Sequence, residues 1–194
     1  MEVRLKIITM LLFAAWRYYW IITERRADRE KPKTKAKPPF FAKIRMTWHG
    51  VWAIAFLLFF QLIFGIAILP LPTSLTIQLV GFALVIIGLG ACVVARRELS
   101  SNWANAWEFQ IKHNQELVTT GIYAFVRHPI YVGLVTAMIG AELVAESYLF
   151  LPFLFIFCLA YLQAKKEEKL LEGHFGKEYA DYKKRTKMFI PFVF

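Results

Sequence analysis

The chain has 194 residues, of which 58% are hydrophobic, and it carries 24 Lys and Arg against 14 Asp and Glu, a net charge of +10. The apolar residues gather in runs long enough to cross a bilayer, which takes about 20 residues. This excludes an ordinary soluble domain and predicts an all-α integral membrane protein with one domain, 1–194, in which the basic excess indicates cytoplasmic loops against anionic lipid rather than a nucleic-acid partner.

Five transmembrane helices are predicted, over residues 3–22, 48–69, 75–94, 129–144 and 148–163. The first resembles a signal peptide in position. It ends, however, in an interfacial aromatic cluster, Trp16 to Trp20, where a small-residue cleavage site would stand, so it is predicted to be retained. Pro129 suits the first turn of the fourth helix. The fifth is expected to continue beyond Gln163 as far as Glu172, because no Pro or Gly lies between them.

Short turns without basic residues separate two pairs of these helices, at 70–74 and 145–147. Each turn is expected to close an antiparallel hairpin. Within the third helix, Gly81, Gly88 and Gly90 are expected to let a neighbouring helix approach closely. Because this glycine-containing run is unbroken and apolar and follows no strand, it does not predict a nucleotide-binding loop or a Rossmann fold.

The distribution of Lys and Arg predicts the topology. Segments 23–47, 96–128 and 164–194 are rich in basic residues. The positive-inside rule then places all three on the cytoplasmic side of a multi-pass protein, with the N-terminus outside and the C-terminus in the cytoplasm.

This topology brings two charged pairs to one place. Arg127-His128 precedes the fourth helix and Glu167-Glu168 lies just beyond the fifth, at the open ends of one hairpin. Ionisable residues at the membrane boundary are usually paired or functional. The arrangement predicts either a salt-bridge latch or a pocket for a ligand with both an amino and a carboxylate group.

The cysteines and histidines do not predict a metal site. Cys92 and Cys158 both lie in apolar runs, where a thiol is usually a small hydrophobic residue. No Cys/His cluster with metal-ligand spacing is found in the sequence. Neither a disulfide nor a bound metal is expected.

Two motifs resemble one known family. The block Leu-Val-Thr-Thr-Gly-Ile-Tyr followed by Arg-His-Pro-Ile-Tyr-Val-Gly (117–133), and the block Glu-Glu-Lys-Leu-Leu-Glu-Gly-His-Phe-Gly-Lys-Glu-Tyr-Ala-Asp-Tyr (167–182) before a final Ile-Pro, are similar to the isoprenylcysteine carboxyl methyltransferase family, in an archaeal or bacterial branch. The resemblance covers roughly the C-terminal half. It implies a membrane methyltransferase that uses S-adenosylmethionine, releases S-adenosylhomocysteine and has no Rossmann fold.

The same resemblance implies site residues in a pocket built from 108–131 and 163–182, facing the cytoplasm. Those carried over to the cofactor are Glu108, Gln115, Glu116, Leu117, Val118, Gly121, Tyr123, His128, Pro129, Ile130, Tyr131 and Glu167. The residues expected to be catalytic are Glu167, Glu168 and Arg127. Gln163 stands on the substrate side, where the family has an arginine, so a carboxylate acceptor is less firmly implied than the cofactor.

Three alternatives remain open. The lipophilic acceptor entering from the bilayer is a prenylcysteine-like carboxylate or, alternatively, a phosphoethanolamine lipid, whose amine would need Glu168 or His174 as base. A sterol-type membrane reductase using NADPH shares a similar C-terminal pattern. A transporter or scaffold is disfavoured, because spans two to five contain almost no polar residue beyond Gln61. The sequence predicts no oligomeric state.

Overall fold

The computed structural model describes residues 2–30, 60–64, 69–72, 74–103 and 114–191. Its elements are α1 (Glu2–Glu30), α3 (Leu75–Leu99), the 3-10 helices η2 (Ser100–Asn102) and η4 (Gly121–Ala124), α4 (Pro129–Val144), α5 (Phe150–Phe175) and α6 (Lys177–Arg185). This part of the chain contains no β-strand, only two isolated bridges. The all-α prediction is confirmed for these residues.

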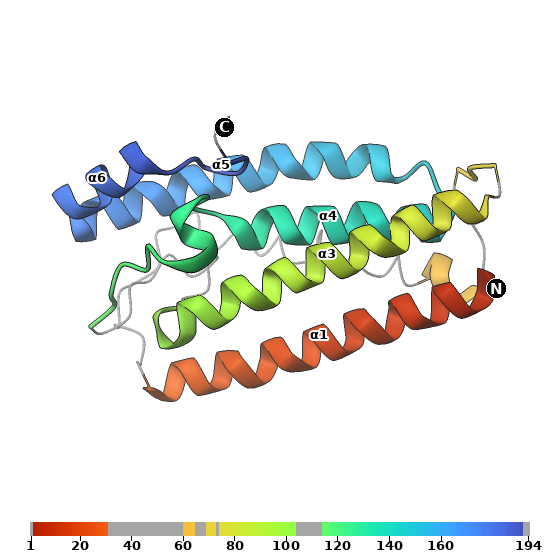
Figure 1. Ribbon diagram of the computed structural model, residues 1–194, viewed down its shortest axis with the longest axis horizontal. Helices are drawn as coiled ribbons and strands as arrows, with labels where there is room; N and C mark the ends of the chain where they lie inside the picture. The colour runs from red at the N-terminus through yellow and green to blue at the C-terminus, as the bar shows by residue number, and fades with distance from the viewer. Residues whose placement is uncertain (1, 31–59, 65–68, 73, 104–113, 192–194) are drawn as a thin grey trace, which may run out of the picture.

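The long helices lie side by side along the long axis of the molecule (Figure 1). α3 lies between α1 and α4, α5 covers the other side of α4, and α6 folds back along the last turns of α5. α4 and α5 run antiparallel, as the predicted hairpin requires. The start of α4 and the end of α5 therefore meet at one end of the row, together with η4 and α6.

Two described helices, Val3–Glu30 and Leu75–Asn102, are long and apolar enough to cross a membrane, and α4 is a shorter apolar helix. Of the predicted span 48–69, the structure describes residues 60–64, which are helical, and residue 69. The count of five spans and their orientation in the membrane stay predictions.

Two helices extend beyond the spans predicted for them. α1 continues to Glu30 instead of ending near Ile22, and α3 continues to Leu99 instead of Val94. Both extensions are polar but rich in Glu, Arg and Ala, which favour helix, so the helix outlasts the apolar run used to predict it. The predicted continuation of the fifth helix is confirmed, since α5 reaches Phe175.

Glycines allow α3 and α4 to come into backbone contact. A Cβ atom added to Gly81 would lie 2.6 Å from the carbonyl oxygen of Gly140, and one added to Gly133 would lie 2.6 Å from that of Gly88. Small residues facing each other in this way are what lets helices pack inside a membrane. Gly90 is an exception to the prediction, because an added Cβ there has no neighbour within 4 Å.

This contrast supports a matched pair of variants. Gly88→Ala is expected to destabilise the protein by about 1–3 kcal/mol, because its methyl group would have to push α4 away. Gly90→Ala makes the same chemical change on an open face and should leave stability unchanged or slightly raised. Thermal unfolding of both variants in detergent measures the difference. Equal melting temperatures would contradict close packing at Gly88.

The two turns without basic residues meet at the other end of the molecule. The amide of Leu71 donates to the carbonyl oxygen of Glu146 at 2.7 Å, and that of Tyr148 donates to the carbonyl oxygen of Leu69 at 2.9 Å. Nearby, buried Gln61 donates to both carboxylate oxygens of Glu142 at 3.3 and 3.0 Å. The turns therefore lie at one end and the charged pairs at the opposite end, as the predicted hairpins require.

Candidate functional site

The C-terminal segment is tied directly to the start of α4. The amide of Arg127 donates to the carbonyl oxygen of Lys187 at 2.9 Å, and the amide of His128 donates to that of Met188 at 3.1 Å. A parallel bridge pairs Val126 with Lys187. These bonds satisfy backbone groups ahead of the helix, where Pro129 occupies the first turn. They fix the two side chains that open α4 against α5 and α6.

Arg127 and Glu168 form a buried ion pair. The Nε atom of Arg127 donates to Oε1 of Glu168 at 2.6 Å, with the two side chains 9% and 3% exposed. The Nη1 atom donates to the carbonyl oxygen of Thr186 at 2.6 Å, and Lys183 Nζ lies 3.4 Å from Glu168 Oε2. The predicted convergence of the charged pairs is confirmed, and this half of it has the geometry of a latch between α4, α5 and the C-terminal segment.

Glu167 faces a different set of groups. Its Oε1 accepts a hydrogen bond from the hydroxyl of Tyr131 at 2.6 Å, and its Oε2 lies 3.5 Å from Nδ1 of His128. Gln163, on the preceding turn of α5 and 7% exposed, adds a side-chain hydrogen bond. The Glu167 side chain is 20% exposed, against 3% for Glu168. The two neighbouring carboxylates therefore differ: Glu168 is bound within the protein, and Glu167 remains open on one side.

The imidazole of His128 lies between the two carboxylates. Its Nε2 is 3.5 Å from Glu168 Oε1 and, although buried, makes no hydrogen bond. The ring stands 5.6 Å from that of Tyr131 and 5.8 Å from that of Phe189. With Nδ1 at 3.5 Å from Glu167 Oε2 and Nε2 at 3.5 Å from Glu168 Oε1, the imidazole bridges the two carboxylates.

The environments of the two carboxylates shift their pKa values in opposite directions. Burial raises the pKa of Glu167 above its ordinary value, and His128, Tyr131 and Gln163 only partly oppose this. Burial alone would also raise the pKa of Glu168, but His128 and Arg127 outweigh it and hold that pKa at about 2. Glu168 is therefore a poor general base at neutral pH, and Glu167 is the better proton acceptor of the two.

Because of this ion pair, the stability of the protein is expected to depend on pH. Because the pKa of Glu168 is lower folded, about 2, than its ordinary 4.5, its stabilising contribution is complete above about pH 4.5 and is lost as the pH falls toward 2. Glu168→Gln removes this pH-dependent contribution to stability. The melting temperatures of wild type and variant should converge as the pH falls through this window. A difference that stays constant would show that Glu168 does not titrate there.

The other predicted cofactor residues lie around η4. Tyr123 is 5% exposed, and its carbonyl oxygen accepts a hydrogen bond from the hydroxyl of Tyr182 at 2.8 Å. Burial, followed by Tyr182 and Glu167, raises the pKa of Tyr123. Gly121 has φ +57° and lies so close to Glu98 that an added Cβ would overlap its carboxylate. The structure thus shows a conformational reason for this glycine, independent of any ligand.

The segment before η4 has no regular structure. It contains Gln115, Glu116, Leu117 and Val118, all exposed or half-buried. The amide of Glu116 donates to Oδ1 of Asn102 at 2.9 Å, which links the segment to η2. Glu108 lies outside the described residues. Pro129 and Ile130 begin α4, and Cys92 Sγ lies 3.5 Å from the carbonyl oxygen of Ile130.

Two groups near the site were not predicted from the sequence. Lys183 and Thr186 complete the surroundings of Arg127, and the only sequence signal for them was the basic run at the end of the second motif.

Arg96 is 2% exposed, and it donates to the carbonyl oxygens of Ser100 and Thr23, both at 2.7 Å. Its guanidinium lies 4.6 Å from the ring of Trp103. It joins α1 to the end of α3.

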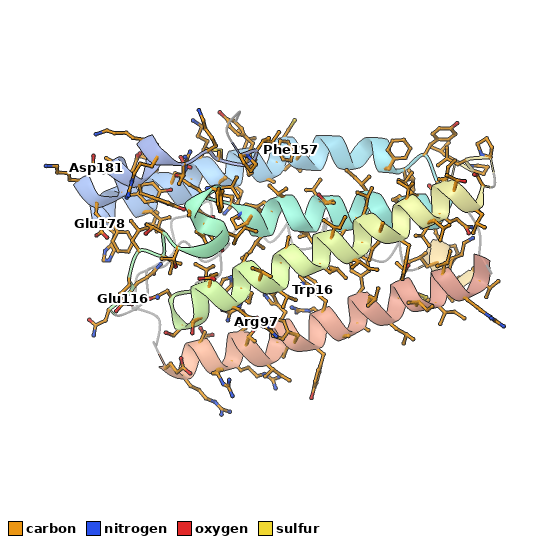
Figure 2. The ribbon with its side chains drawn as sticks, in the orientation of Figure 1. Trp16, Arg97, Glu116, Phe157, Glu178 and Asp181 are labelled. Carbon is orange, nitrogen blue, oxygen red and sulfur yellow. The ribbon has the colours of Figure 1, made fainter. Side chains whose placement is uncertain are left out.

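Figure 2 shows how many charged side chains gather at this end of the molecule: Arg97, Glu116, Glu178 and Asp181 all lie in the half that contains η4 and α6. Phe157 lies where the C-terminal segment crosses α5, and its ring is 4.9 Å from that of Phe189. The site therefore has an apolar support on its α5 side, formed by Ala164, Met188 and Phe189 with Phe157 and Tyr161.

Comparison with known proteins identifies similar chains. A protein-S-isoprenylcysteine O-methyltransferase of Saccharomyces cerevisiae is 32% identical over 116 residues, which cover 58% of this chain and 48% of the yeast protein. A nickel-cobalt-cadmium resistance protein of Alcaligenes xylosoxydans xylosoxydans is 37% identical over 82 residues, or 41% of this chain and 38% of that protein. The chain thus spans less than half the length of these curated relatives.

A solved structure also agrees with the fold. The structure of a eukaryotic intramembrane Ras methyltransferase, isoprenylcysteine carboxyl methyltransferase, matches with a TM-score of 0.55 and 28% identity, over 60% of this chain and 43% of that one. The motif-based resemblance is confirmed by these matches. The family described as phospholipid methyltransferase matches residues 76–178, from the start of α3 into α6 and including every residue of the charged cluster on α4 and α5. The chain belongs to the phospholipid methyltransferase family.

Proposed function

We propose that this protein is a membrane methyltransferase that transfers the methyl group of S-adenosylmethionine to a lipophilic acceptor, at a site facing the cytoplasm. The observation that carries the proposal is the contrast between two adjacent carboxylates. Glu168 is paired with Arg127 and Lys183, whereas the side chain of Glu167 is 20% exposed and its Oε2 lies 3.5 Å from Nδ1 of His128. Glu167 is therefore the carboxylate of this pair that can still accept a cationic group of a ligand.

The residues present suit this cofactor. Its amino-acid part carries an ammonium group, for which Glu167 is an open acceptor, and its adenine is a flat ring, for which Tyr123 and Tyr131 are aromatic neighbours. His128 Nε2 supplies a buried polar atom. We assign these four residues to cofactor binding. The predicted contributions of Glu108, of segment 115–118, of Gly121 and of Pro129-Ile130 remain part of the same proposal.

The cofactor supplies a methyl group that is already activated for transfer to a nucleophilic oxygen or nitrogen. The protein's part is then positioning and the exclusion of water. Arg127 and Glu168 hold the ends of α4 and α5 in register, so that His128, Tyr131 and Glu167 keep their mutual geometry. Of the three residues predicted to be catalytic, we therefore assign positioning roles to Arg127 and Glu168 and direct ligand contact to Glu167.

The first acceptor we propose is a prenylcysteine-like carboxylate. It is ionised at neutral pH and needs no base. Gln163 would face it from α5 with a neutral amide in place of a guanidinium, so its affinity should be lower than a guanidinium would provide. The similarity to proteins named for isoprenylcysteine methylation supports this choice.

A second acceptor, a phosphoethanolamine lipid, is favoured by the match to a phospholipid methyltransferase family and by the neutral Gln163. Its amine must lose a proton. Of the bases considered from the sequence, Glu168 has a pKa of about 2, and His174 is exposed on the last turn of α5, away from the charged cluster. Glu167 has a raised pKa but is assigned above to the ammonium group of the cofactor, so this acceptor would have to bind as the free amine.

One assay separates these acceptors. Purified protein in mixed micelles is supplied with methyl-labelled S-adenosylmethionine and either a prenylcysteine analogue or phosphatidylethanolamine. A methyl ester releases volatile methanol in alkali, whereas an N-methyl group is stable. Transfer to neither acceptor, together with no binding of S-adenosylhomocysteine, would refute the methyltransferase proposal. Binding of NADPH in its place would support the sterol-type reductase.

A further inference from the structure

A second feature of this end of the molecule is a pocket lined by Arg127 and Lys183, the two cationic partners of Glu168. Its volume is about 310 Å³, and its lining includes four cationic side chains: Arg127, Lys165, Lys183 and Lys187. Thr186 and Tyr161 add hydroxyl groups, and no acidic residue belongs to the lining. The three lysines of this lining have no assigned role in the methyl transfer proposed above.

Several of these cations retain unused binding capacity. Hydrogen bonds engage Nε and Nη1 of Arg127, but none within the described chain engages its Nη2. Lys165 and Lys187 are exposed and have no carboxylate partner among the described residues; Lys165 Nζ lies 5.5 Å from the ring centre of Tyr161. Lys183 is partly neutralised by Glu168 and Glu172. The pocket therefore has an excess of positive charge and free donors, which suits a phosphate with several charged oxygens.

The position of the pocket relates it to the bilayer. Lys165 follows directly after the predicted fifth span, which ends at Gln163. On the same helix, Leu162, about one turn before it, is 55% exposed, and Leu159, nearly two turns before it, is 51% exposed. Exposed leucines followed by a lysine are typical of a helix that leaves the hydrocarbon region at the level of lipid phosphates. A phosphate at this level belongs more naturally to a lipid than to a solute.

We propose that this basic pocket binds the phosphate of an anionic membrane lipid, and that the bound headgroup fastens α5 to the C-terminal segment. The site is separate from methyl transfer and does not depend on it. Its partners come from three places: the residue pair before α4, the middle of α5 and the segment 183–188. Ligand binding to a folded arrangement of this kind raises its stability.

The test uses the full chain in a neutral detergent. Phosphatidylglycerol or phosphatidylcholine is titrated into the protein, and bound lipid is counted by native mass spectrometry. Wild type should retain one phosphatidylglycerol in preference to phosphatidylcholine, with a rise in melting temperature. Lys165→Gln/Lys187→Gln should weaken retention about 25-fold, about fivefold for each lysine near an anionic lipid. The matched control, Lys166→Gln/Lys184→Gln, removes two exposed lysines outside the lining and should bind like wild type.

Three results would overturn the proposal. Equal retention by both double variants would show that the pocket is not the site. Displacement of the lipid by equimolar glycerol phosphate would indicate a site for free phosphate esters. Unchanged lipid retention combined with a raised KM for the methyl acceptor in Lys165→Gln/Lys187→Gln would make the pocket part of the acceptor site. Because lipid binding is read without turnover, failure of the methyltransferase proposal leaves this result interpretable.

Discussion

Glu167→Ala is expected to weaken the binding of S-adenosylhomocysteine about 100-fold or more, because the variant removes the one open carboxylate of the site. Isothermal calorimetry on purified wild type and variant measures this directly. Glu167→Gln keeps a hydrogen-bond acceptor for Tyr131 but not the charge, so it should recover folding and little affinity. Binding by wild type should also weaken as the pH falls, and earlier than for an ordinary carboxylate, because the pKa of Glu167 is raised.

The matched control for this experiment is Glu178→Ala. Glu178 is an exposed carboxylate in the first turn of α6, away from the charged cluster of α4 and α5 (Figure 2). Its loss removes the same charge from the same end of the molecule and should leave binding unchanged. If Glu167→Ala binds S-adenosylhomocysteine as tightly as wild type, the proposed cofactor site is wrong. If Glu167→Ala and Glu178→Ala lose the same affinity, the effect is one of long-range charge only.

Arg127→Ala is expected to lower the free energy of unfolding by about 3–5 kcal/mol, because it leaves the buried carboxylate of Glu168 without its main partner. Lys183 Nζ, at 3.4 Å from Glu168, should keep the loss toward the lower end of this range. The loss also removes three hydrogen bonds from Nη1 to Lys183 and Thr186, so limited proteolysis should release the C-terminal segment earlier. Thermal unfolding in detergent, followed by intrinsic tryptophan fluorescence, gives the stability change.

Two companion variants interpret this result. Lys184→Ala breaks an exposed ion pair with Asp181, whose side chains are 76% and 46% exposed, and should change stability by less than about 1 kcal/mol. Arg127→Met/Glu168→Leu removes both charges together and should recover much of the loss, since no buried charge is left alone. If the double variant is no more stable than Arg127→Ala, the hydrogen bonds to Thr186 rather than the ion pair hold this region together.

Part of the site was predictable from local patterns. The Arg-His-Pro sequence placed Arg127 and His128 just before the first turn of an apolar helix. The lack of a helix breaker after the predicted fifth span placed Glu167 and Glu168 on the continuation of that helix. Because the turn between these helices is short, the two pairs had to meet. Their contact across 41 positions is therefore a consequence of helix lengths and one turn, which a sequence does encode.

Other features depend on which face of a helix packs against which neighbour. Gly88 and Gly90 look alike in the sequence, yet only Gly88 faces α4. The extended ends of α1 and α3 were missed because hydropathy marks the membrane and not the end of a helix. For Arg96, the nearby Trp103 was a signal, but its bond to Thr23 needs α1 to lie alongside α3.

By itself, then, the sequence determined the membrane class, the order of the described helices, the family resemblance and the meeting of Arg127-His128 with Glu167-Glu168, because hydropathy, helix breakers and motif spacing are properties of the chain. Only the tertiary structure divided that cluster into a buried latch, Arg127 with Glu168, and an open carboxylate, Glu167. The reason is that adjacent residues on a helix point in directions about 100° apart. The residues that α4 and the C-terminal segment place on each side determine how deeply Glu167 and Glu168 are buried and which groups they contact. These surroundings also cause the opposite pKa shifts of the two carboxylates.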